Sequence, residues 1–234
     1  MIFAGIVAGG CGSRMKCADK PKQFLEIGNV PVLIRTVKAF LGVKKIDKIY
    51  VGIKADWHEY ADEIFDEFGV VTERVKIIDG GADRNATVMA ILDEITSEYE
   101  CGNGDIILTH DAVRPFVSKK IIEDNIECAK KYKVCGTYIP AIDTIVKSTD
   151  ANVVESSLTR SELYQAQTPQ SFDIGALCVC RDRLSKEKLS ILTDTCGIFT
   201  ECGINIHIVE GDVQNFKITT DYDYKVANLL IKNR

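Results

Sequence analysis

Residues 2–25 read IFAGIVAGGCGSRMKCADKPKQFL, and this opening stretch indicates the fold class of the whole chain. An apolar run of strand type ends at Ala8. The turn that follows holds Gly9, Gly10 and Gly12. Glycines let a loop bring its amides against a ligand, and amides with cations beside them form a receptor for phosphate groups. Arg14 and Lys22 supply such cations, so the stretch predicts a strand followed by a phosphate-binding loop.

The size and charge of the chain exclude several classes of protein. Its 234 residues can bury a full core. A net charge of -5 argues against a nucleic-acid-binding domain. No stretch approaches the ~18 consecutive apolar residues that span a membrane, and the N-terminus carries no signal-peptide pattern. We therefore expect a cytoplasmic protein that acts without a membrane or nucleic-acid partner.

Apolar runs alternate with amphipathic stretches along most of the chain. The expected strands are 2–8, 46–53, 75–78, 106–109, 135–141 and 204–209. The expected helices are 30–40, 57–68, 84–98, 119–131 and 222–232. This alternation predicts an α/β fold of Rossmann-like type, a mostly parallel sheet with helices on both faces. Ligands of such sheets bind beyond the carboxyl ends of the strands.

Residues 144–168 break this alternation. Apolar and polar residues alternate there around a polar turn at 149–152, which is typical of a β-hairpin or arm. No internal repeat or linker divides the chain. We therefore expect residues 1–234 to form a single domain with a projecting β-arm.

Three further segments carry residues suited to binding phosphates. Asp111 follows an expected strand, where a carboxylate can hold magnesium or cap a helix; Arg114 lies just after it, whereas His110 suits a packed imidazole better than a catalytic base. Arg84 and neighbouring polar residues open an expected helix, where a plain helix cap is the alternative. Lys217 precedes the last helix and, taken alone, would be a solvated lysine.

The glycine loop by itself leaves an alternative open. A dinucleotide-binding fingerprint, G-x-G-x-x-G, also follows a first strand. Here no glycine follows Gly12 at the required spacing, Arg14 stands in that stretch instead, and no acidic residue closes a second strand about 20 residues on. An NAD-dependent oxidoreductase is therefore the weaker interpretation.

Taken together, these segments resemble the 2-C-methyl-D-erythritol 4-phosphate cytidylyltransferases and their ribitol-5-phosphate relatives, enzymes with a fold of nucleotide-diphospho-sugar transferase type. The motifs that carry the resemblance are, in order, AGGCGSRM, PKQFL, GGADRNATV, HDAVRP, DTIVKS, QAQTPQ, LTDTC and NFKIT. The erythritol branch typically has HDAARP, alanine-leucine before TPQ, and TDEA. This chain has HDAVRP, YQAQTPQ and TDTC instead, which favours the ribitol branch.

The resemblance implies a role for each motif. Main-chain groups of Ala8, Gly9, Gly10, Cys11 and Gly12 would surround CTP. Arg14 and Lys22 would bind its triphosphate, and Lys217 its α-phosphate. Gly80, Arg84 and Thr87 would face the cytosine and ribose, and Asp111 would hold Mg²⁺. Thr144, Arg160 and Thr193 would hold the polyol phosphate beside Arg114, with Arg160 supplied by the arm of a second subunit. The chain has Gln214-Asn215 where erythritol-type enzymes often have aspartate-asparagine, so a second metal carboxylate is not expected.

The implied reaction transfers CMP from CTP to D-ribitol 5-phosphate, giving CDP-ribitol for a teichoic-acid type of cell-wall polymer. The implied assembly is a homodimer clasped by its arms, with a reductase as a further partner that supplies the polyol phosphate. Two alternatives stay open at this point. One is transfer to methylerythritol phosphate in isoprenoid synthesis, and the other is a nucleotide-binding module without catalysis.

Overall fold

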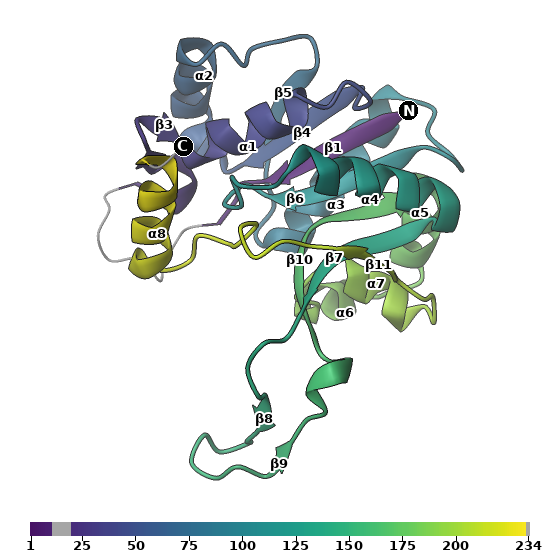
Figure 1. Cartoon of the computed structure of the whole chain (residues 1–234). Helices are drawn as coiled ribbons and strands as arrows, with labels where there is room; N and C mark the ends of the chain where they lie inside the picture. The colour runs from purple at the N-terminus through teal and green to yellow at the C-terminus, as the bar shows by residue number, and fades with distance from the viewer. Residues whose placement is uncertain (11–19, 233–234) are drawn as a thin grey trace.

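A seven-stranded sheet forms the centre of the protein in a computed structural model, which describes residues 1–10 and 20–232 (Figure 1). The strand order is β11-β7-β10-β6-β1-β4-β5. The strands are β1 (Ile2–Val7), β4 (Lys48–Ile53), β5 (Val75–Asp79), β6 (Ile106–Asp111), β7 (Val134–Pro140), β10 (Tyr164–Asp173) and β11 (His207–Glu210). Every neighbouring pair is parallel except the two that involve β10. The predicted α/β fold with a mostly parallel sheet is confirmed.

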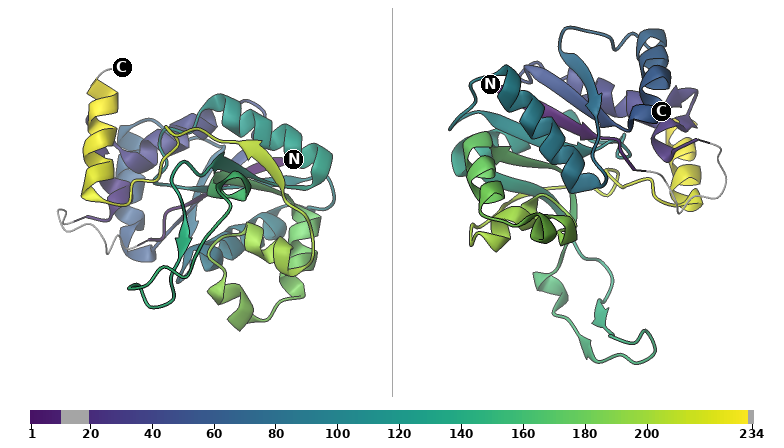
Figure 2. Two further views of the ribbon diagram at one scale, coloured as in Figure 1. Left: turned by 60° about the horizontal axis from the view of Figure 1, so that its bottom comes forward. Right: turned by 180° about the vertical axis from the view of Figure 1, so that it is seen from behind.

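Side chains on successive strand residues point to opposite faces of the sheet, and each face is covered by helices. The face that includes Ala4 and Ile6 packs against α1 (Val32–Leu41), α2 (His58–Glu67) and α4 (Lys119–Tyr132). The face that includes Phe3 packs against α3 (Arg84–Glu98), α5 (Ile174–Asp182) and α7 (Cys196–Glu201), and Figure 2 shows α3 and α5 from this side. Both faces are buried at the centre of the sheet, and β1, with the sequence IFAGIV, is accordingly apolar at every position.

A smaller cluster lies beside this sandwich. The two short strands β2 (Glu26–Ile27) and β3 (Val30–Pro31) pair with each other and pack with α8 (Asp221–Lys232). The remaining short elements are η1 (Lys22–Phe24), η2 (Ala55–Trp57), η3 (Arg160–Glu162) and α6 (Lys186–Ile191). None of the helices in the described part of the chain is long and apolar enough to cross a membrane.

The segment after residue 144 departs from the alternation of strands and helices, as predicted. The departure extends beyond the predicted arm, because the strand that follows the arm joins the central sheet. The short strands β8 (Val146–Lys147) and β9 (Ser156–Ser157) pair within an arm that projects from the sheet (Figures 1 and 2). The chain then returns through β10, which runs antiparallel between β6 and β7. The sequence analysis predicted neither β10 as a sheet strand nor the helices α5, α6 and α7.

Close packing between β4 and α3 gives a stability prediction. A Cβ atom added at Gly52 would lie 2.4 Å from the Thr87 Cγ2 atom and 3.4 Å from the Ile91 Cδ1 atom. Overpacking of a core costs about 1–3 kcal/mol, so we expect Gly52→Ala to lower the free energy of unfolding by this amount in urea denaturation. Gly102→Ala is the matched control, since no heavy atom lies within 4 Å of its added Cβ. Equal stability of the two variants would contradict the prediction.

Candidate active site

A cavity of about 170 Å³ opens beyond the carboxyl ends of β1 and β6. These two strands are parallel neighbours, so the segments that follow them meet at one edge of the sheet. The cavity is lined by Val7, Ala8, Gly9, Gly10, Lys22, Gln23, Ala82, Asp83, Arg84, Thr87, Asp111, Ala112, Val113 and Lys217. The predicted nucleotide-binding segments therefore do converge, although they lie up to about two hundred residues apart in the sequence.

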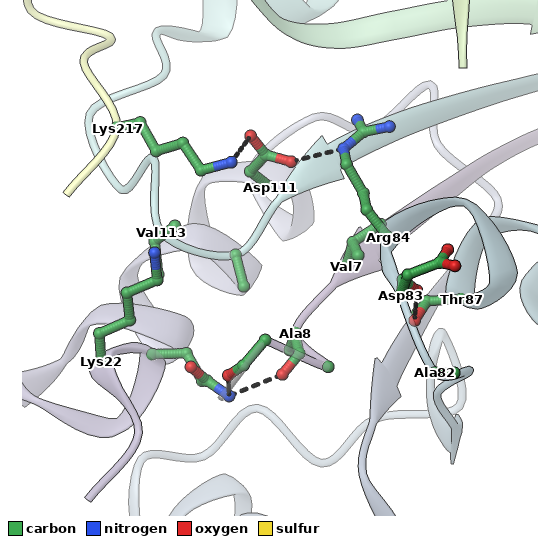
Figure 3. A pocket seen from close by; sticks show the side chains of 14 residues that line it. Val7, Ala8, Lys22, Ala82, Asp83, Arg84, Thr87, Asp111, Val113 and Lys217 are labelled. Atoms are coloured by element: carbon green, nitrogen blue, oxygen red, sulfur yellow. Dashed lines mark hydrogen bonds and ion pairs between the residues drawn. The ribbon is translucent and has the colours of Figure 1, made fainter. Parts of the chain in front are cut away.

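The start of the glycine loop is fastened by the PKQ segment. The buried Gln23 Nε2 atom donates hydrogen bonds to the carbonyl oxygens of Ala8, at 2.7 Å, and Gly10, at 3.2 Å. Lys22, at the start of η1, enters the same cavity (Figure 3). The sequence analysis named Lys22 but did not predict this role for Gln23. Only the position of Gln23 in the PKQFL motif indicated that it matters.

The N-terminus of α3 forms another wall. The Asp83 carboxylate accepts a hydrogen bond from the Ala86 amide at 2.8 Å and caps the helix. The Thr87 hydroxyl donates to the Asp83 carbonyl at 2.8 Å, and a Cβ added at Gly9 would lie 3.1 Å from that hydroxyl oxygen. A helix N-terminus favours anions, so this wall suits a phosphorylated ligand.

Three cations surround the Asp111 carboxylate, and Figure 3 shows two of them, Arg84 and Lys217. Its Oδ1 atom accepts a hydrogen bond from Arg84 Nε at 2.9 Å, and its Oδ2 atom lies 3.0 Å from Lys217 Nζ and 3.4 Å from Arg114 Nε. Burial by itself would raise the pKa of Asp111, but the charges of Arg84, Lys217 and Arg114 outweigh it and hold the pKa well below its usual range. The cluster keeps an excess of positive charge, which an anionic ligand can neutralise.

His110, the neighbour of Asp111 on β6, points to the other face of the sheet and packs against Phe40. Its Nε2 atom lies 3.1 Å from the Arg114 carbonyl oxygen, so this nitrogen carries the proton. Burial lowers the pKa of His110 to about 3, and the ring is neutral. The expectation that His110 is packed agrees with this geometry.

A second cavity, of about 200 Å³, shares Arg84, Asp111 and Lys217 with the first. It is lined in addition by Arg114, Ala166, Gln167, Thr168, Gln170, Thr193 and Asp194. The two cavities thus meet at the charged cluster. This arrangement can hold two anionic ligands with their phosphate groups next to each other.

Some predicted residues are not brought to these cavities. Gly80 is not among the described lining residues; its amide donates to the Ile53 carbonyl at 2.7 Å. Thr144 and Arg160 are exposed on the arm, where Arg160 Nη1 donates to the Ile142 carbonyl at 3.2 Å. Arg84, in contrast, does line both cavities. Its guanidinium, which was expected to face the cytosine and ribose, contacts Asp111 and Thr195. Cys11, Gly12 and Arg14 lie outside the described residues.

A network that the sequence analysis missed holds the segment carrying Thr193. The buried Gln170 side chain donates to Asp194 Oδ2 at 2.7 Å and accepts from the Thr195 amide at 3.2 Å. The Thr195 hydroxyl accepts from Arg84 Nη1 at 3.0 Å. These contacts join residues far apart in the sequence. In the sequence itself, only the motifs QAQTPQ and LTDTC indicated that these residues matter.

The Asp111 carboxylate is a suitable ligand for a magnesium ion that arrives with a polyphosphate. Among residues 1–10 and 20–232, no three His, Cys, Asp or Glu side chains gather as a metal-binding group. Mg²⁺ in phosphate-transfer sites takes one or two carboxylates and completes its shell with phosphate oxygens and water. The single hard carboxylate of Asp111, at the wall shared by both cavities, fits that mode.

The sequence model of the family described as 2-C-methyl-D-erythritol 4-phosphate cytidylyltransferase (IspD) matches residues 2–233. The chain belongs to this family. It is therefore a nucleotidyltransferase, a CTP-dependent cytidylyltransferase whose second substrate is a phosphorylated sugar or polyol. The NAD-dependent oxidoreductase and the module without catalysis, both considered from the sequence, are wrong for this chain.

Solved structures of family members agree with this assignment. The 4-diphosphocytidyl-2C-methyl-D-erythritol synthase from Anaerococcus prevotii is 26% identical, with a TM-score of 0.83, and the match covers 99% of this chain and 98% of that one. The 2-C-methyl-D-erythritol 4-phosphate cytidylyltransferase from Francisella tularensis is 29% identical, with a TM-score of 0.80 over 97% of this chain and 98% of that one.

The pKa of Asp111 gives a pH-dependent stability prediction. Because the folded-state pKa lies below the unfolded value of about 3.9, the ionised carboxylate stabilises the fold above that pH. This contribution is lost as the pH falls from there through the folded pKa. We expect Asp111→Asn to be about 3–5 kcal/mol less stable at neutral pH, since it removes the charge of the buried carboxylate that pairs with Arg84, Arg114 and Lys217. Urea denaturation near pH 3 should show a smaller gap, and a gap independent of pH would contradict the prediction.

Proposed function

We propose that the second substrate is D-ribitol 5-phosphate and that the products are CDP-ribitol and pyrophosphate. The second cavity carries this proposal. Among its described lining residues Ala166 is the one apolar residue, and the others are polar or charged. Ribitol phosphate presents an unbranched chain of hydroxyl groups, whereas methylerythritol phosphate carries a methyl branch. A polar wall favours the first. The motifs YQAQTPQ and TDTC, which line this cavity in part, also favour the ribitol branch.

The reaction follows from the meeting of the two cavities. A phosphate oxygen of the polyol phosphate attacks the α-phosphorus of CTP, a new P–O bond forms, and the bond from the α-phosphorus to the bridging oxygen breaks as pyrophosphate leaves. The nucleophile is already an anion near neutral pH, so the site needs no general base, and the neutral His110 is not required as one. The chemical demand is to bring polyanions together and stabilise their charge.

The cations of the site have separate parts in this proposal. Lys217 contacts the α-phosphate, Lys22 and Arg14 bind the triphosphate, and Arg114 and Thr193 bind the polyol phosphate. Asp111 would hold Mg²⁺, which would supply charge neutralisation on the phosphate oxygens. The Lys217 ammonium lies 3.0 Å from Asp111 Oδ2 at the junction of the cavities, and it can turn from the carboxylate to the incoming phosphate.

The arm supports a homodimer in the same proposal. Apolar side chains on it are exposed in the single chain: Val146, Val153, Val154 and Leu158. Thr144 and Arg160 lie on the same arm, away from the cavities of their own chain. A second subunit would cover the apolar residues, and its arm would bring Arg160 to the polyol phosphate. Supply of the polyol phosphate by a reductase stays a prediction from the resemblance.

Pyrophosphate release tests the choice of substrate. With CTP and Mg²⁺ present, we expect D-ribitol 5-phosphate to give at least a tenfold higher kcat/KM than 2-C-methyl-D-erythritol 4-phosphate, roughly the discrimination of one well-placed polar contact. Higher kcat/KM with methylerythritol phosphate would overturn the proposed substrate and leave the cytidylyltransferase activity in place.

The oligomeric state tests the proposed role of the arm. We expect a dimer by light scattering at micromolar concentration. Val154→Asp places a charge on an exposed apolar residue of the arm and should shift the protein to a monomer with a raised KM for the polyol phosphate. Val179→Asp, at an exposed valine of α5, is the matched control and should stay dimeric. A wild-type monomer would remove the role given to Arg160.

A further inference from the structure

A short connecting segment, residues 192–195, lies between α6 and α7 and forms part of the second cavity. Thr193 and Asp194 of this segment line that cavity. The preceding helix, α6, packs against α3, and the first turn of α3 lines the first cavity. Contacts between the connecting segment and the start of α3 therefore join the walls of the two cavities.

Asn85, in the first turn of α3, holds the start of the connecting segment. Its Nδ2 atom donates hydrogen bonds to the carbonyl oxygens of Leu192, at 2.6 Å, and Leu189, at 3.3 Å. Both partners are acceptors, so the nitrogen of the carboxamide must be the atom that faces them. The last carbonyls of a helix have no partner within that helix, and here a neighbouring helix supplies one for the end of α6.

Arg84, the residue before Asn85, holds the other end of the connecting segment. Its Nη1 atom donates to the buried Thr195 hydroxyl oxygen at 3.0 Å, and its Nε atom donates to Asp111 Oδ1 at 2.9 Å. Two consecutive residues of α3 thus hold residues 192 and 195. Thr193 lies between these two fixed points.

The carboxamide of Asn85 satisfies the connecting segment and leaves its own oxygen without a partner. The side chain is only 4% exposed, and its Oδ1 atom is buried with no hydrogen-bond partner in the described part of the chain. A buried polar atom without a partner costs free energy, and such costs are expected where a side chain has a function. Asn85 is not among the described lining residues of either cavity, so it acts on the substrates through the residues that it holds.

We propose that Asn85 is a positioning residue for the phosphorylated acceptor, which keeps Thr193 in place at the wall of the second cavity. Its motif, GGADRNATV, is associated with the nucleotide by the sequence, yet the contacts of Asn85 lead to the site of the other substrate. This inference rests on one part of the proposed function, the assignment of the second cavity to the acceptor. It holds for either polyol phosphate.

The KM values for the two substrates test the proposal. Asn85→Ala removes the donor to Leu192 and Leu189, and we expect it to raise the KM for the acceptor about tenfold, roughly the effect of lost hydrogen bonds, with the KM for CTP unchanged. The acceptor in this assay is whichever of the two polyol phosphates the wild type uses with the higher kcat/KM. Asn85→Leu, which fills the same space without a donor, is the second variant and has the same expected result.

A double-mutant cycle separates positioning from a general loss of structure. If Asn85 acts by placing Thr193, Asn85→Ala combined with Thr193→Ala should raise the KM for the acceptor no further than Thr193→Ala alone. Additive effects of the two substitutions would overturn the proposal.

Asn228→Ala is the matched control. The Asn228 Nδ2 atom also donates to a carbonyl, that of Tyr224 at 3.0 Å, but within α8, so its loss should leave both KM values unchanged. The role given to Asn85 is wrong if Asn85→Ala and Asn85→Leu leave the KM for the acceptor unchanged or raise the KM for CTP equally. Neither result changes which polyol phosphate the wild type prefers, so the proposed substrate is judged separately.

Discussion

The ion cluster around Asp111 is the interaction on which the site depends. One buried carboxylate receives Arg84 from the start of α3, Arg114 from the loop after β6, and Lys217 from the segment before α8. Buried charges are tolerated when they are paired, so the carboxylate and its cations hold these three segments in place together. The excess of positive charge that remains is what two polyanionic substrates require. A single residue thus links the stability of the protein to its chemistry.

Side-chain carboxamides supply the other constraint. Gln23 fastens the start of the glycine loop, Gln170 fastens the segment after α6, and Gln167 fastens the segment after β11. Each uses hydrogen bonds to backbone or side-chain groups of segments that have no regular ladder of their own. Loops carry most binding residues in α/β proteins, and buried amides can hold such loops without adding charge to a cluster that already contains several cations.

Most of the fold could be predicted from the sequence, because its strands and helices have strong local patterns. The apolar run of β1 and the amphipathic pattern of α4 each predict which of their residues are buried. Strand β10 does not: its first residues are exposed and pair with β7, and its last residues are buried between β6 and β7. Its partners lie in segments remote in the sequence, so its local pattern changes along its length and does not predict an antiparallel strand in a parallel sheet.

The sequence by itself predicted a set of phosphate-binding residues, and among the described ones Gly9, Gly10, Lys22, Asp111, Arg114 and Lys217 line the two cavities. These residues lie in short motifs, in which residue types suited to binding phosphate stand close to a predicted strand or helix. Only the tertiary structure decided which side chains meet. It paired Arg84 with Asp111, kept His110 apart on the other face, and buried Gln167 against Asp212. Contacts of this kind depend on how parallel strands align their ends and how the sheet separates its faces, and no local pattern of residues carries that information.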